Sequence, residues 1–331
     1  MSATVKQVAQ YAGVSVATVS KYINGGNLKP EYLARVEKAV RELDYQVNEV
    51  ARNLKTKKSF LVGVLVPSLG IRFYASIISR IQKILLDKGY TTLLLGYRRN
   101  NRIDFRHLDV LLRWHVDGII LFPATNEKQL LEKILRQGIP VVLVDNLIEG
   151  IQCDAVIINN YESAFSATEK LISLNHRNIA LCRGPYETYT AAERVRGYLD
   201  AMRQSGLAPL IEDGNYNLED AYHATKRLML AESPPTALLC SNLTMSYGMI
   251  RALIELGRRI PEDVSAIAFG EQELDFVLPT PLTRVIPPMD EISRRVAERI
   301  VRKIEHPDET QTPRVETLRA EIQYTVSIRQ I

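Results

Sequence analysis

The sequence contains little cysteine and histidine, which excludes several kinds of site. Its 331 residues include 3 Cys and 5 His. Cys153, Cys182 and Cys240 form no C-x-x-C motif, and the histidines lack metal-ligand spacing, so the sequence predicts neither a zinc site nor a disulfide framework. We expect the cysteines to be core thiols, the histidines to lie at the surface or at helix ends, and the protein to need no cofactor.

Long apolar runs and the glycine motifs of common enzymes are also lacking. No uninterrupted apolar stretch approaches the ~20 residues of a membrane helix, and no charged segment followed by an apolar one opens the chain. There is no G-x-G-x-x-G after Val66, no P-loop and no G-x-S-x-G. The sequence therefore predicts a cytoplasmic protein that is not an enzyme.

What the sequence does contain is a helix-turn-helix pattern over residues 5–24, VKQVAQYAGVSVATVSKYIN. Val8 and Ala9 share one face of the first helix, Gly13 allows a tight turn, and Ser15 suits the N-cap of the second helix. Two packed helices in an unrelated core have the same pattern, so DNA binding is inferred only together with the features that follow.

The outward residues of the second helix are the predicted readers of DNA. Val16 and Ala17 make only apolar contacts, for which a thymine methyl is the natural partner, whereas Lys21 reaches guanine O6 and N7. We expect Thr18 and Ser20 to hold phosphates.

A third helix, predicted over residues 30–43, completes a small head. Its buried stripe is expected to consist of Leu33, Val36, Val40 and Leu43. Residues 1–58 carry 7 Lys and 3 Arg against 4 Glu and 1 Asp, a net charge of +5, whereas the whole chain has +4. The basic surplus therefore belongs to the head and the hinge segment after it, as phosphate binding requires.

The segment from Val5 to Leu54 resembles the LacI/GalR repressors, notably in AGVSVATVSKYIN and NEVARNL. The resemblance implies that the hinge from Asn48 to Leu54 folds into a short helix on operator DNA, where Leu54 opens a minor-groove base step. Unstacking costs about a few kcal/mol, which the contacts of the bent DNA offset. Val47 departs from the family, which usually has Pro there, so the unbound hinge is freer.

From Phe60 onward, apolar runs of strand length alternate with amphipathic helical stretches. This alternation is typical of α/β chains whose parallel sheets are covered on both faces. The expected strands are 61–66, 91–95, 118–122, 141–144, 155–158, 179–182, 237–240 and 264–269. This is more strands than a single sheet usually contains, so we expect two doubly wound lobes.

The resemblance continues in VGVLVP, VDGIILF, IPVVLVDN, ERVRGY, IPEDVSAIAF, PLTRV and VSIR. It implies a periplasmic-binding-protein-like core with two lobes joined by three crossovers. The expected parts are a helix-turn-helix domain 1–46, a hinge helix and linker 47–58, and an effector-binding and dimerisation core 59–331, divided into a first lobe 59–158 and 286–314 and a second lobe 159–285 and 315–331. A solute-binding transport protein has the same lobes but would carry a signal segment and no DNA-binding head.

Ligands of such open sheets bind beyond the carboxyl ends of the strands, so the interlobe cleft is the expected effector site. By the resemblance, Arg194 in ERVRGY holds effector oxygens, Tyr216 stacks on the ligand, and Phe73 and Tyr74 form an aromatic pair after the first strand. Asn242 also matches an effector-binding position of the family. An aromatic floor suits a sugar ring.

Two departures from the family affect the effector. Leu243 and Gly270 stand where Asp is usual, and Arg72 replaces a small residue or Pro, so the local potential shifts positive unless Glu271 compensates. Charge-assisted hydrogen bonds from Arg72 and Arg194 then favour an anionic effector such as a sugar acid or sugar phosphate. The alternative is an ordinary sugar held by other hydrogen bonds, with Arg72 in solvent.

Together these features predict an allosteric, carbohydrate-sensing homodimer that represses sugar or sugar-acid utilisation genes. Two heads on palindromic double-stranded operator DNA add their contacts and their discrimination. The alternative is a repressor with a degenerate cleft that answers to a protein partner, such as a phosphorylated carrier protein.

Overall fold

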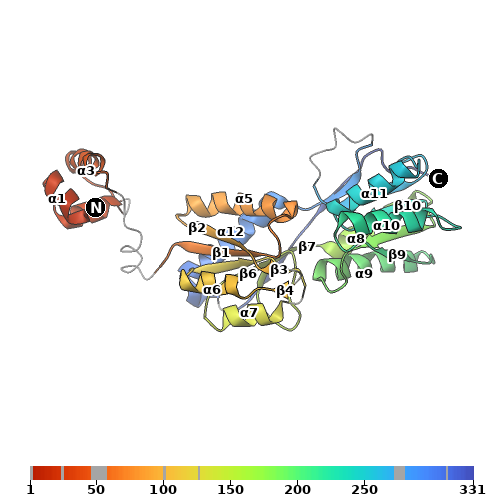
Figure 1. Cartoon of the computed structure of the whole chain (residues 1–331), viewed down its shortest axis with the longest axis horizontal. Helices are drawn as coiled ribbons and strands as arrows, with labels where there is room; N and C mark the ends of the chain where they lie inside the picture. The colour runs from red at the N-terminus through yellow and green to blue at the C-terminus, as the bar shows by residue number, and fades with distance from the viewer. Residues whose placement is uncertain are drawn as a thin grey trace. The chain divides into compact units, whose positions relative to one another are not determined.

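The protein is described from a computed structural model that covers residues 3–23, 26–45, 58–99, 102–125, 127–271, 280–310 and 312–331. The chain forms two compact units, Met1–Ser59 and Phe60–Ile331 (Figure 1). The division falls at the expected end of the linker. Within the ranges given, no helix is both long enough and apolar enough to cross a membrane.

The first unit contains three helices whose ends follow from local sequence. They are α1 (Val5–Ala12), α2 (Val16–Ile23) and α3 (Pro30–Glu42). Thr4 and Gln7 form a capping box at the start of α1, which ends at Gly13 in the left-handed conformation, with a φ of 61°. Pro30 occupies the first turn of α3, where its missing N–H costs nothing.

The core of this unit differs from the predicted stripe at one position. Val36 and Ala39 of α3 are fully buried, whereas Leu33 is 37% exposed. The small side chain of Ala39 lets α1 and α3 pack closely, and Leu33 lies in the first turn of α3, outside that contact. The buried residues are Val8, Ala9, Ala12, Val19, Val36, Ala39 and Tyr45.

The second unit contains two six-stranded sheets, which confirms the two α/β lobes. The first sheet has the order β13-β7-β6-β5-β1-β2 and the second has the order β14-β12-β11-β10-β8-β9. The strands of the first sheet are β1 (Leu61–Val66), β2 (Thr91–Gly96), β5 (Gly118–Leu121), β6 (Val141–Val144), β7 (Asp154–Ile158) and β13 (Val315–Leu318). The strands of the second are β8 (Ile179–Arg183), β9 (Leu210–Asp213), β10 (Ala237–Cys240), β11 (Ser265–Phe269), β12 (Thr283–Ile286) and β14 (Glu321–Gln323). A small hairpin, β3 (Arg98–Arg99) and β4 (Arg102–Ile103), follows β2.

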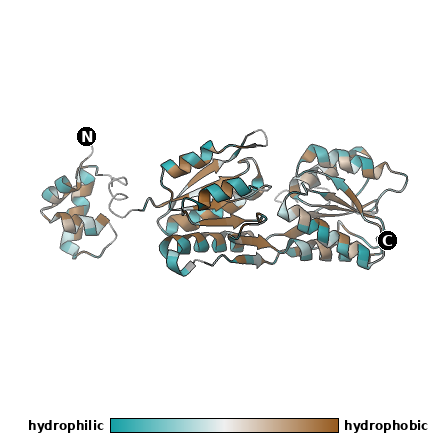
Figure 2. Cartoon of the chain, turned by 90° about the horizontal axis from the view of Figure 1, so that it is seen from below, coloured by the Kyte–Doolittle hydropathy of each residue, from teal (hydrophilic) through white to brown (hydrophobic). Residues whose placement is uncertain are grey.

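Helices cover both faces of each sheet, and the hydrophobic strands lie between them (Figure 2). In β1, Val62 and Val64 pack with α5 and α12, whereas Leu65 points to the opposite face, beneath α6 and α7. Burial on both faces explains why the strand sequences are continuously apolar. The helices are α5 (Arg72–Asp87), α6 (Arg106–Arg113), α7 (Lys128–Leu135), α8 (Asn160–Ser173), α9 (Tyr189–Gln204), α10 (Leu218–Met229), α11 (Leu243–Glu255) and α12 (Met289–Glu305).

The chain passes between the two sheets three times, after β7, after β12 and between β13 and β14. β13 pairs with β7 in the first sheet, so the predicted boundary that assigned residues from 315 to the second lobe is wrong by one strand. Two crossovers are hydrogen-bonded to each other, because Ala320 N donates to Asn159 Oδ1 at 2.8 Å and Asn159 N donates to Leu318 O at 3.0 Å.

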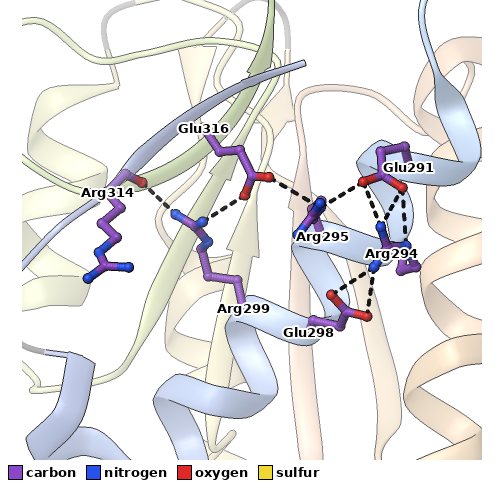
Figure 3. Close-up of polar contacts among 7 residues, drawn as sticks. All are labelled: Glu291, Arg294, Arg295, Glu298, Arg299, Arg314 and Glu316. Atoms are coloured by element: carbon purple, nitrogen blue, oxygen red, sulfur yellow. Dashed lines mark hydrogen bonds and ion pairs between the residues drawn. The ribbon is translucent and has the colours of Figure 1, made fainter. Parts of the chain in front are cut away.

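Ion pairs also fix β13 on the first lobe (Figure 3). Glu316 of β13 pairs with Arg295 at 3.2 Å and with Arg299 at 2.7 Å, both on α12. Glu291 extends the network along α12 through Arg294 and Arg295. The pairs along α12 are more exposed than those of Glu316 and contribute little stability individually, so the network mainly holds the crossover strand in place.

The three cysteines are buried and free, as expected of core thiols. Cys182 and Cys240 are far apart in sequence, yet they are paired in register on the neighbouring strands β8 and β10. Both belong to the core between the second sheet and helices α10 and α11. Burial among apolar side chains keeps such thiols unreactive.

One histidine lies near a helix end, just after α8, and is buried rather than at the surface. His176 is fully buried, with Nδ1 2.8 Å from Thr236 Oγ1 and Nε2 3.0 Å from Ser265 Oγ and 3.1 Å from Arg329 O. The ring therefore joins β11 and the last residues of the chain to the loops before β8 and β10. Burial lowers the pKa of His176, because the imidazolium charge is poorly solvated there.

This lowered pKa predicts acid sensitivity of the second unit. As the pH falls below ~6.5, the ordinary histidine pKa, the unfolded chain takes up the proton first, so the free energy of unfolding decreases. In urea unfolding at pH 7 and pH 5, His176→Gln should be less stable than the wild type at pH 7 by about 1–3 kcal/mol. It should also lose less stability on acidification. His223→Gln, which removes an exposed histidine, is the control, and equal pH slopes in the wild type and His176→Gln would contradict the assignment.

Candidate functional site

The exposed face of α2 carries the predicted readers of DNA. Ser15 caps the helix, since its Oγ accepts a hydrogen bond from Thr18 N at 3.1 Å, and Val19 is fully buried. These contacts fix the rotation of α2 about its axis. The predicted base-reading residues that this rotation leaves exposed are Val16, Ala17 and Lys21.

The predicted phosphate-binding residues of α2, Thr18 and Ser20, are less exposed than the predicted base readers. Thr18 and Ser20 are half-buried, and the Thr18 hydroxyl lies 2.8 Å from Ser15 Oγ within the helix cap. Asn48 and Leu54 lie outside the described residues, so their roles remain predictions.

Arg35 of α3 holds the turn between the first two helices. Its Nη2 donates to Gly13 O at 3.0 Å, and a Cβ at position 13 would lie 2.2 Å from that nitrogen. The positive φ favours glycine at this position, and a larger residue would in addition displace the Arg35 side chain from the turn. The turn and α3 together set the direction in which α2 presents its exposed face.

In the second unit, Arg194 is the central cation at the carboxyl ends of the strands. It is 8% exposed, its Nε donates to Asn160 Oδ1 at 2.8 Å, and its Nη1 donates to Ser241 O. The guanidinium also lies over the Phe269 ring, 4.3 Å from the centroid. Arg194, predicted to bind the effector, thus already makes hydrogen bonds to the protein through Nε and Nη1, which fix the orientation of its guanidinium.

The predicted aromatic residues are half-buried at the same strand ends. The Phe73 and Tyr74 rings are 5.7 Å apart, and Tyr74 packs on Phe122 at 5.3 Å. Tyr216 has a positive φ of 57°, and its hydroxyl lies 3.0 Å from Thr190 Oγ1. The three predicted rings therefore come from both lobes.

The two lobes meet through polar groups that the sequence analysis missed. Asn146, which follows β6, accepts a hydrogen bond from Thr190 N of α9 at 3.0 Å and donates to Pro123 O at 2.9 Å. Asp145 precedes it with a φ of 71°. Burial raises the pKa of Asp145 to about 6, although the nearby Arg194 guanidinium opposes the rise.

Tyr74 connects these groups into one assembly. Burial raises the pKa of Tyr74, with further contributions from Asp145, Tyr216 and Glu127, while Arg98 acts in the opposite direction. We call the residues of this assembly the interlobe polar cluster: Tyr74, Arg98, Glu127, Asp145, Asn146, Thr190, Arg194 and Tyr216. Arg98, Asp145, Asn146 and Tyr216 follow within three residues of the carboxyl end of a strand, which is the signal that could have identified them in the sequence.

Three predicted effector residues are not part of this cluster. The Asn242 side chain caps α11, because its Oδ1 accepts a hydrogen bond from Met245 N at 2.8 Å. Arg72 and Glu271 are exposed. The Cβ of Leu243 lies 3.1 Å from where a Cβ of residue 270 would stand, so Leu243 and Gly270 are neighbours and neither supplies a carboxylate.

The sequence matches two family models, one described as bacterial regulatory proteins, lacI family, over residues 4–48, and one described as periplasmic binding proteins and sugar binding domain of LacI family, over residues 59–324. The chain belongs to the LacI family. As a LacI-family member it is a DNA-binding transcriptional repressor, and its curated relatives are regulators rather than enzymes.

Individual relatives agree with this assignment. The chain is 32% identical over 308 residues to catabolite control protein A of Priestia megaterium, with 92% of each chain covered. It is 32% identical over 325 residues to the HTH-type transcriptional repressor PurR of Vibrio campbellii, with 97% of each covered. The Lac repressor dimer bound to operator and the anti-inducer ONPF is similar in fold, with a TM-score of 0.88, 23% identity, and 99% and 100% of the two chains covered. The predicted fold, with a helical head and two parallel-sheet lobes, is confirmed.

The raised pKa of Asp145 makes a test of the cluster possible. Stability that is present while the carboxyl is protonated is lost as the pH rises through about 6. Asp145→Asn keeps the shape of the side chain and tolerates the positive φ, so it should gain about 1–3 kcal/mol relative to the wild type between pH 5 and pH 8. Urea unfolding at the two pH values measures this difference. Asp213→Asn, at an exposed ion pair with Arg183, should show no such gain, and a wild-type pH slope in Asp145→Asn would refute the burial of this carboxyl.

Proposed function

We propose that this LacI-family repressor controls sugar or sugar-acid utilisation genes through a small ligand bound at the interlobe polar cluster. The observation that carries the proposal is the hydrogen bond between Asn146 of the first lobe and Thr190 of the second, whose hydroxyl contacts Tyr216. Tyr74, Asp145 and Arg194 belong to the same cluster. Aromatic rings pack on the C–H face of a sugar, and the charged groups hydrogen-bond its oxygens. The family description of the core as a sugar-binding domain supports the same class of ligand.

The protein is inferred to act as a homodimer on palindromic operator DNA. Among the described residues of one head, the exposed predicted base readers are Val16, Ala17 and Lys21, which give little discrimination, whereas two heads on a two-fold symmetric site add their contacts. The Lac repressor, which has the same fold, binds its operator as a dimer.

Control follows from the order of the parts along the chain. The hinge segment is followed directly by β1 of the first lobe. A ligand that changes how the two lobes pack against each other can therefore change the position of the first lobe, and with it the position of the attached hinge. Moving such a repressor from mostly bound to mostly free requires about 5 kcal/mol of differential ligand affinity between the two states. A ligand that contacts both lobes can supply that difference.

A second candidate is control by a protein partner, such as a phosphorylated carrier protein. Leu243 and Gly270, neither of which supplies a carboxylate, favour this alternative. A phosphorylated partner would need cations that are available to pair with its phosphate. The cations of α12 are instead all ion-paired within the protein: Arg299 and Lys303, for example, both pair with the buried Asp154. The cavity of about 350 Å³ beside α12 is likewise lined by paired charges.

Titration separates these candidates. Operator release by purified protein is measured with a panel of sugar acids, sugar phosphates and their neutral parents, and binding of each is measured by isothermal titration calorimetry. The small-ligand proposal predicts that at least one anionic compound binds and changes operator affinity. Silence of the whole panel, with operator binding intact, favours the partner.

Base reading by Lys21 is tested separately. Lys21→Ala should reduce preference for the operator over random DNA by about 1–3 kcal/mol, because it removes contacts to guanine acceptors. Lys38→Ala removes the same charge from an exposed position of α3 and should weaken binding to both DNAs alike. Competition binding at fixed salt measures the ratio, and an unchanged ratio in Lys21→Ala would remove this residue from the readers.

A further inference from the structure

Arg98 belongs to the interlobe polar cluster but was not predicted from the sequence. It follows β2, and its Nη2 donates to Thr125 Oγ1 at 2.5 Å and pairs with Glu127 Oε1 at 3.2 Å. The side chain is 22% exposed, so the guanidinium is held largely inside the protein at the carboxyl edge of the first sheet.

The partner of Arg98 has no remaining capacity for a ligand. Glu127 is fully buried, and its oxygens accept hydrogen bonds from Ala124 N, from Thr125 N and from the Thr125 hydroxyl at 2.9–3.2 Å. Arg98 neutralises this buried carboxylate. The pair is therefore fixed in place, and Arg98 cannot swing toward solvent without leaving Glu127 buried and unpaired, which is strongly destabilising.

One N–H group of this fixed guanidinium lacks a hydrogen-bond acceptor. Within the described part of the chain, Arg98 Nε is buried and has no hydrogen-bond acceptor. A buried N–H without an acceptor costs about 1–3 kcal/mol, so native proteins seldom retain one without a reason. The orphaned N–H points to an acceptor that the protein itself does not provide.

The surroundings indicate what that acceptor is. The Tyr97 hydroxyl donates to Phe122 O and accepts from Ala124 N, both at 3.1 Å, so it is fully used. The Tyr74 hydroxyl lies close enough to Arg98 for the guanidinium to lower the pKa of Tyr74, against the effect of burial. The unsatisfied, cationic Arg98 Nε donor and a tyrosine hydroxyl therefore lie in the same region.

We propose that Arg98, together with the Tyr74 hydroxyl, forms the anion-binding part of the effector site and holds a carboxylate or phosphate oxygen of the ligand. The proposal rests on the small-ligand function given above. A charge-assisted N–H···O⁻ bond from a rigidly held guanidinium is stronger than a neutral one. On this account Arg98 distinguishes an acidic sugar from its neutral parent, and Arg194 orients the second lobe around the ligand.

The test compares Arg98→Lys with the wild type. Lysine keeps the charge beside Glu127 and reaches Thr125, but it lacks the Nε–H edge, so the fold should survive, as judged by an unchanged thermal midpoint. We expect isothermal titration to show at least about tenfold weaker binding of the acidic ligand. Binding of gluconate and of glucose 6-phosphate distinguishes a carboxylate from a phosphate, and glucose is the neutral parent.

Two further variants keep the test decisive. Arg106→Lys, at an exposed pair with Asp104, should leave affinity unchanged. If Arg98→Lys unfolds, Arg98→Gln combined with Glu127→Gln removes the buried pair together and should lose the same anion preference. Equal binding of glucose and the two anions, undiminished affinity in Arg98→Lys, or no binding of either anion would overturn the proposal. Operator binding by the same preparations, measured without ligand, shows whether the regulator function itself stands.

Discussion

The arrangement of the second lobe depends on one buried cation. Removing a guanidinium from water costs several kcal/mol unless the protein replaces its hydration. Arg194 receives that replacement from Asn160 at the start of α8, from the carbonyl of Ser241 after β10, and from the face of Phe269 at the end of β11. A single side chain thus fixes the first crossover and two strand ends relative to one another, and its charge acts on Asp145 of the first lobe.

The contact between the lobes at this edge includes polar groups beside the apolar packing of Tyr189, and the polar groups suit reversible control. The Asn146–Thr190 hydrogen bond and the Asp145 carboxyl opposite Arg194 are groups whose partners a ligand's oxygens can replace with little net change in hydrogen bonding. An apolar contact of the same size would hold the lobes together whether or not a ligand were present. Elsewhere, the lobes are joined by the hydrogen-bonded crossovers.

Local patterns in the sequence predicted what depends on local physics. The capped helices of the head, the continuously apolar strands and the exposure of Val16, Ala17 and Lys21 all follow from spacing within a few residues. Contacts between distant segments were not predictable in the same way: Ala39 replaces Leu33 in the core because of how α1 meets α3, and β13 joins the first sheet through its pairing with β7. Arg98 and Glu127 form a buried pair across 29 positions, which no periodicity within either segment reveals.

Every role proposed for the two-lobed unit depends on sequence-selective DNA binding by the first unit. This selectivity is measured by passing sheared genomic DNA over purified full-length protein at low and at physiological salt and sequencing the retained fragments. We expect a small set of fragments that share a two-fold symmetric sequence, with selectivity that persists as salt weakens the phosphate contacts. Retention that is independent of sequence at every salt concentration would contradict this expectation.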